Sequence, residues 1–189
     1  MTLNLSNAAS FKQHIRYMAS TSSWSMSLEG EKGQKSFQFT QAVFNLKNIK
    51  TGWGLFIEGQ APEWVMDESI SKPAAKPQDG REWKRGFKVD VFSKTLFGNV
   101  PVREFATTAT GAVMGIIDLY KQYEEQAPQN IGKSPVVEYK GSAPLKVGKG
   151  NTTVPSLKIV KFVDDPSEFD TSGEISVVAE PAKVAVNEF

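Results

Sequence analysis

Alternation of apolar and polar side chains is the feature that most constrains the fold of this chain. Residues 83–92 alternate strictly, with Phe87 and Val89 on one side and Lys88 and Asp90 on the other. A period of two is typical of a half-buried strand, because successive side chains of a strand point to opposite faces of its sheet. The chain is therefore predicted to be mainly β. Further strands are predicted at 24–29, 36–47 (with one bulge), 53–58, 64–66, 135–139, 144–147 and 156–163.

Two segments show helical spacing instead. Residues 108–126 carry the more regular pattern, and Thr108 or Thr110 could cap the start of this helix. Residues 6–19 are predicted to form a shorter helix, whereas residues 68–82 have no periodicity and are predicted to be a long exposed loop. The apolar stripe of the longer helix is predicted to contain Val113, Ile116, Ile117, Tyr120 and Tyr123.

Five or more strands, with one substantial helix before the last of them, favour a mainly β fold that contains α structure. This order suits an OB-like five-stranded barrel, in which a helix lies between the third and fourth strands. A β-sandwich with one inserted helix has the same strand count and stays open as an alternative.

Composition excludes several kinds of chemistry. The chain has no Cys, which excludes disulfides, thiolate zinc sites and cysteine nucleophiles and fits a reducing compartment. It has no run of 18 apolar residues, and Met1–Ser10 lacks the layout of a signal peptide, so no membrane interaction is expected. The single histidine, His14, has no nucleophile near it in sequence. We therefore expect an intracellular protein with no cofactor and no metal.

Charge is divided unequally along the chain. Residues 1–163 hold 21 basic and 14 acidic side chains, a net charge of +7, whereas the last 26 residues hold one basic and seven acidic side chains, a net charge of −6. A basic body favours a polyanionic partner, and an acidic tail favours a basic partner or the body itself. The alternative is ordinary solvated surface charge. We predict one domain over 1–165 and a flexible acidic tail over 166–189.

Aromatic residues are abundant and often lie next to basic ones. There are 20 Phe, Trp and Tyr residues, and a single-strand binder needs this combination because bases stack on rings while Lys and Arg follow the phosphates. Phe37, Phe39 and Phe87 are predicted to be core, and other rings could be core as well. Trp83-Lys84-Arg85 ends the long loop and could close over a strand, or it could be an ordinary solvated loop end. The predicted DNA-binding residues are Lys47, Lys50, Trp53, Phe56, Trp83, Lys84, Arg85, Lys88, Phe92, Lys94 and Arg103.

The terminus carries a resemblance. Seven acids, from Asp164 to Glu188, precede a terminal Phe189, with Lys183 interrupting them. This layout resembles the OB-fold single-stranded-DNA-binding proteins of tailed bacteriophages, and loosely those of bacteria. The resemblance implies that the protein coats and protects single-stranded DNA in phage replication or recombination within the host cytoplasm. It also implies that Glu188 and Phe189 recruit replication or recombination proteins, and it allows a homodimer or a cooperative array.

Two other functions stay open. Glu138-Tyr139-Lys140 resembles the core of Mg²⁺-dependent phage nucleases, in which carboxylates bind the metal and the lysine polarises the attacking water. Asp90 or Asp118 would have to supply the second carboxylate. A β-rich structural protein of a phage particle is the other alternative. The main prediction is that the protein is not an enzyme.

Overall fold

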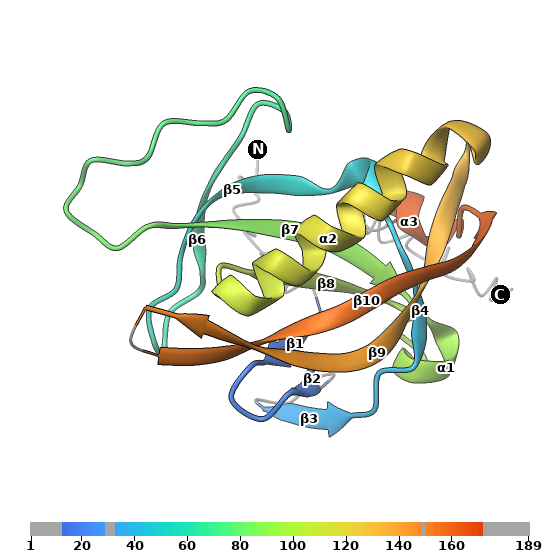
Figure 1. The fold of residues 1–189 in the computed structure, drawn as a ribbon, viewed down its shortest axis with the longest axis horizontal. Helices are drawn as coiled ribbons and strands as arrows, with labels where there is room; N and C mark the ends of the chain where they lie inside the picture. Colours follow the sequence, from blue (N-terminus) through green and yellow to red (C-terminus); the bar gives the residue numbers. More distant parts are fainter. Residues whose placement is uncertain (1–12, 29–32, 149, 172–189) are drawn as a thin grey trace, which may run out of the picture.

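The computed structural model describes residues 13–28, 33–148 and 150–171, and it is mainly β with few helices (Figure 1). Three α-helices are present in this part of the chain: α1 (Lys94–Phe97), α2 (Thr110–Gln126) and α3 (Glu168–Thr171). Short 3-10 turns, η1 (Leu46–Asn48) and η2 (Ala127–Gln129), accompany them. The strands are β1 (His14–Met18), β2 (Ser23–Ser27), β3 (Gln34–Phe37), β4 (Gln41–Phe44), β5 (Lys50–Leu55), β6 (Glu63–Met66), β7 (Lys84–Phe92), β8 (Val102–Thr107), β9 (Lys133–Val147) and β10 (Gly150–Asp164).

The strands form one mixed sheet in the order β10-β9-β4-β7-β8-β1-β2-β3, while β5 and β6 continue beside the first half of β7. Only the β1–β8 pair is parallel among the described strand pairs. Within the sheet, the strands β9-β4-β7-β8 have the spatial order of a Greek key, because the connection through α2 returns the chain from β8 to the far side of β4. The outer strands of this path, β10 and β3, are not paired with each other in the described residues, so the sheet does not close.

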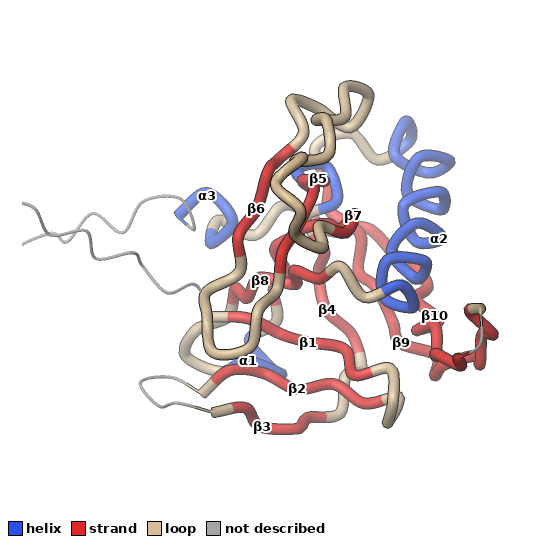
Figure 2. The backbone as a smooth tube through the Cα atoms, turned by 90° about the vertical axis from the view of Figure 1, so that its left-hand side faces the viewer, coloured by secondary structure: helices blue, strands red, loops and turns tan. Residues whose placement is uncertain are grey.

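The core lies between the inner face of the sheet and α2. Phe39 and Phe87 are buried as predicted, and Val89 and Val91 share the buried face of β7 with Phe87, whereas Phe37 is only half-buried. In Figure 2, α2 and α3 lie on opposite sides of the strands. No helix in the described part of the chain is long and apolar enough to cross a membrane.

The helix predicted over 6–19 is wrong where the structure can be compared with it. His14–Met18 is the strand β1, and residues 1–12 lie outside the described part. Ile15 and Tyr17 are buried on one face while Arg16 between them is exposed, which is the period of a strand. Pairing with β2 and β8 supplies the backbone hydrogen bonds that a local helical pattern would otherwise provide.

The strand predicted over 36–47 divides in two. β3 pairs with β2, and after a break at 38–40 β4 pairs with β9 and β7 instead. The parity change read as a bulge in the sequence is therefore the point where the chain passes from one part of the sheet to another.

The long helix is confirmed, but its buried face differs from the predicted stripe. Ile116 and Leu119 are buried, whereas Ile117 is 48% exposed. The face turns toward Gly111 and Gly115, because these glycines let the helix backbone approach β10: a methyl group at Gly111 would collide with the carbonyl oxygen of Thr153. Neither predicted threonine caps the helix, which begins at Thr110 after the N-cap residue Ala109 and has no side-chain cap.

Candidate nucleic-acid interface

Strands β5 and β6 and the first half of β7 form a three-stranded ribbon at one end of the molecule (Figure 1). Residues directly opposite one another in antiparallel strands share a face. Gly54 lies opposite both Lys84 and Trp64, and Trp53 lies opposite both Arg85 and Val65. The register therefore places Trp64 and Trp53 on opposite faces of the ribbon.

The ring of Trp64 lies across two glycines of neighbouring strands. Methyl groups at Gly54 and Gly86 would come within 3.0 Å of its ring carbons, so only residues without a Cβ leave room for it there. The Lys88 ammonium lies 5.1 Å from the centre of the Trp64 ring. Phe56, which is 42% exposed, meets the same ring edge-on with 5.7 Å between ring centres.

We call this cluster the Trp64 platform: Phe56, Trp64 and Lys88, with the exposed Lys50 and Lys84 beside them on the same face. A half-buried indole with an exposed phenyl ring beside it offers apolar area on which a planar base can stack. The neighbouring ammonium groups are placed to attract phosphate. Sequence reasoning included four of these residues but missed Trp64, since the glycines beneath it are far from it in sequence. The only sequence signals for this position of Trp64 were the Gly-x-Gly in β5 and the glycine in β7.

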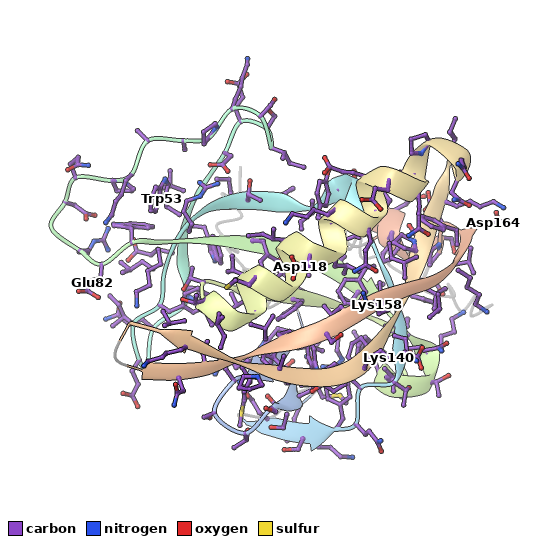
Figure 3. The ribbon with its side chains drawn as sticks, in the orientation of Figure 1. Trp53, Glu82, Asp118, Lys140, Lys158 and Asp164 are labelled. Carbon is purple, nitrogen blue, oxygen red and sulfur yellow. The ribbon has the colours of Figure 1, made fainter. Side chains whose placement is uncertain are left out.

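On the other face of the ribbon, Trp53 and Arg85 hold the loop 67–82. The Trp53 indole donates a hydrogen bond to the carbonyl of Ala74 at 2.9 Å, and the Arg85 guanidinium lies 5.3 Å from the Trp53 ring. Arg85 also donates to both carboxylate oxygens of Asp67, at 2.7 and 2.5 Å. In Figure 3, Trp53 points into the space that this loop encloses. These two residues stay predicted DNA contacts, but in this structure they are engaged within the protein.

Asp67 is the centre of this loop anchor. Its side chain is 1% exposed and also accepts hydrogen bonds from the Thr51 hydroxyl and the Ala74 backbone N–H. The hydrogen bonds from Arg85 hold the pKa of Asp67 well below its usual range, and those from Thr51 and Ala74 lower it further. The carboxylate is therefore ionised throughout the neutral pH range.

Replacing Asp67 with alanine is expected to lower the free energy of unfolding by roughly 1–3 kcal/mol, because it removes the acceptor that the half-buried donors of Thr51, Ala74 and Arg85 share. Trypsin should then cut faster after Arg81, the one basic residue of the loop 67–82 that is not followed by proline. Because the pKa of Asp67 is lower in the folded protein than in the unfolded one, its ionised carboxylate stabilises the fold at pH values above the unfolded pKa of about 4. This stabilisation is lost as the pH falls below that value. The difference between the two proteins in urea unfolding should therefore shrink on acidification. Equal stability at pH 7 would contradict the anchor.

Two predicted DNA contacts are buried. Trp83 is 5% exposed, and its indole donates to Asp79 at 2.9 Å, which fixes the end of the loop. Arg103 is 4% exposed and donates to the carbonyl of Ser27 at 2.7 Å, which joins β8 to the end of β2. Neither side chain is presented to a ligand in this structure, because tertiary packing covers what the sequence pattern leaves on a loop end or a strand surface.

Three further predicted contacts meet the chain that follows β10. Lys47 pairs with Asp165, Lys94 pairs with Glu168 at 2.9 Å, and Phe92 packs edge-on against Phe169 with 6.2 Å between ring centres. The hydrogen bond from Lys94 lowers the pKa of Glu168. We call Asp165–Phe169 the α3 segment. Packed structure thus continues past residue 165, and the predicted partner-binding residues Glu188 and Phe189 lie outside the described residues.

The nuclease alternative requires Asp90 or Asp118 close to Glu138 and Lys140. Glu138 and Lys140 form an ion pair of 2.7 Å on β9. Asp118 lies on α2, well apart from Lys140 (Figure 3), and Asp90 lies on β7 opposite Glu104 of β8. In the described part of the chain, no three His, Asp or Glu side chains come close enough together to hold a metal ion.

Comparison with protein-family models, curated proteins and solved structures found no match to this chain. The function proposed below rests on the geometry of the site.

Proposed function

We propose that this protein binds single-stranded DNA without strong sequence preference, and coats and protects it during phage replication or recombination. The observation that carries the proposal is the Trp64 platform, in which an indole ring supported by two glycines lies among an exposed phenyl ring and lysine ammonium groups. Such a surface recognises the faces of bases and their phosphates. Every base has such a face, so the binding is tolerant of sequence.

The chemistry of the platform favours a single strand over a duplex. In a duplex the faces of the bases are covered by their neighbours, and a protein reads only edges, phosphates and shape. Stacking on Trp64 and Phe56 requires bases that are already free of such neighbours. Lys50, Lys84 and Lys88 then neutralise the adjoining phosphates and release their counterions.

The strand order supports an OB-like arrangement for the body of the protein. Taking β4 and β5 as one bent strand, the five strands would be β4/β5, β7, β8, β9 and β10, with α2 between the third and fourth of them. OB-folds bind nucleic acid on the face of strands two and three and through the loop between strands one and two. Residues 56–83 correspond to that loop, and the platform lies where it meets β7. The hairpins of β1–β3 extend this core beyond β8.

The test is a titration with oligo-dT. Addition of the oligonucleotide should quench tryptophan fluorescence, and log K should fall with log salt at a slope of roughly −3.5 if about five phosphates are neutralised at about −0.7 each. Duplex DNA of equal length should bind more weakly. Absence of both the quench and the salt dependence would overturn the proposal, and Mg²⁺-dependent cleavage that Glu138→Ala removes would favour the nuclease.

A further inference from the structure

A groove runs along β4 beyond the end of β7, from the face of the sheet that carries Phe92 to the core-facing side that carries Tyr139. It consists of two adjoining hollows of about 470 and 520 Å³, which share Thr40 and Glu138 among their lining residues. Pockets of this size are large enough for small planar ligands. One hollow is lined by the half-buried rings of Phe37 and Tyr139, and the other contains Phe92. We call this feature the β4 groove.

The second hollow of the β4 groove lies on the same face of the sheet as the Trp64 platform. Phe92 lies opposite Val43, Val43 opposite Val136, and Val136 opposite Lys161, so one row of side chains crosses β7, β4, β9 and β10. Lys88 of the platform is four residues before Phe92 on β7 and therefore shares its face. At about 3.3 Å per residue, the two sites are roughly 13 Å apart along the strand.

The lining of the groove has the two components that a single strand requires. Phe37, Tyr139 and Phe92 supply rings on which bases can stack. Lys94 and Lys161 lie along the second hollow with exposed side chains, and Lys94 is there paired with Glu168 of the α3 segment. The amide of Gln38 and the hydroxyl of Thr40 add neutral hydrogen-bonding groups at the first.

Acidic groups on this face restrict the path. Glu138 is paired with Lys140 at 2.7 Å and lies opposite Lys158, so neighbouring lysines balance its charge. Asp90 lies opposite Glu104 on the β8 side of β7, which would repel phosphate. A strand that runs from Lys88 to the groove would therefore pass on the β4–β5 side of β7, past Lys50.

We propose that the β4 groove is a second subsite, which binds the continuation of the same DNA strand that stacks on the Trp64 platform. The inference rests on the function proposed above. It predicts that a short oligonucleotide occupies the platform alone, whereas a longer one occupies both sites. Footprints of about 4–16 nucleotides per OB-fold accommodate both cases.

The test compares dT4 and dT12, each with a fluorescent label, by anisotropy. Thr40→Glu places a carboxylate on an exposed residue shared by both hollows. It should weaken dT12 binding roughly tenfold or more and leave dT4 binding within about twofold. Ile117→Glu, which adds the same charge to the exposed side of α2, is the matched control and should change neither.

Equal dT12 affinity in Thr40→Glu and the wild type would overturn the second subsite. An equal loss for dT4 and dT12 would also overturn it, because the groove would then not be separate from the platform. Lys161→Ala provides an independent readout, since it should weaken dT12 only and reduce the salt slope by about 0.7. If the wild-type protein binds neither oligonucleotide, the proposed function itself fails, and that result is distinguishable from the others.

Discussion

Replacing Trp64 with alanine is expected to weaken the binding of dT12 by roughly 1–3 kcal/mol, or about 5- to 150-fold in Kd. The substitution removes the ring that lies over Gly54 and Gly86 and leaves Phe56 and Lys88 without the surface they pack against. Anisotropy of labelled DNA is the appropriate measurement, because the variant also loses a fluorescent indole. The half-buried position of Trp64 in a ribbon at one end of the molecule predicts only a modest loss of stability.

Gly54→Ala tests the same platform without removing the ring. A methyl group there would meet the side chains of Trp64 and Thr108 rather than backbone, so the ring should be displaced while the strands stay paired. DNA affinity should fall, and the unfolding midpoint should change little. A methyl at Gly86 would instead collide with the carbonyl of Thr107, so Gly86→Ala is expected to disturb folding and is less informative. Unchanged DNA affinity in a folded Trp64→Ala protein would remove the platform from the binding site.

Releasing the α3 segment is expected to strengthen DNA binding several-fold. Asp165 and Glu168 hold Lys47 and Lys94, and Phe169 covers part of Phe92, so this segment places carboxylates and a ring where the proposed ligand would place phosphates and bases. The double variant Glu168→Gln with Phe169→Ala should free Lys94 and Phe92. Its salt dependence should be steeper by about 0.7, since one more phosphate is neutralised.

A protein that ends at Thr171 is the control for this prediction. It keeps the α3 segment and lacks only the residues beyond it, so it separates the effect of the segment from that of the acidic residues that follow. If the double variant binds DNA more weakly than the wild type, Phe92 and Lys94 do not belong to the binding surface. If only the shortened protein gains affinity, the competition comes from beyond Thr171.

Local patterns predicted most of the strands but not all of them. Strict alternation over 83–92 identified β7 within one residue, and helical spacing identified α2. β8 was not predicted, because its buried positions are occupied by Arg103 and Phe105, and a buried arginine breaks the apolar alternation that marks a strand. Segments 135–139 and 144–147 are one continuous strand, β9, whose pairing with β10 spans the weak pattern between them.

The features of the candidate site were likewise only partly predictable from the sequence. The supply of rings and lysines around 47–94 and the concentration of acidic residues after 163 could be predicted from the sequence, because both are counts of side chains along the chain. Which of these side chains are accessible to a ligand depends on the tertiary structure. Parity separates the two faces of a strand, but it does not show which face a loop covers. Asp67 draws Arg85, and with it Trp53, under the loop 67–82, while glycines on two other strands leave room for Trp64 on the opposite face. Both outcomes depend on contacts between residues distant in sequence, and these form only when the strands pair.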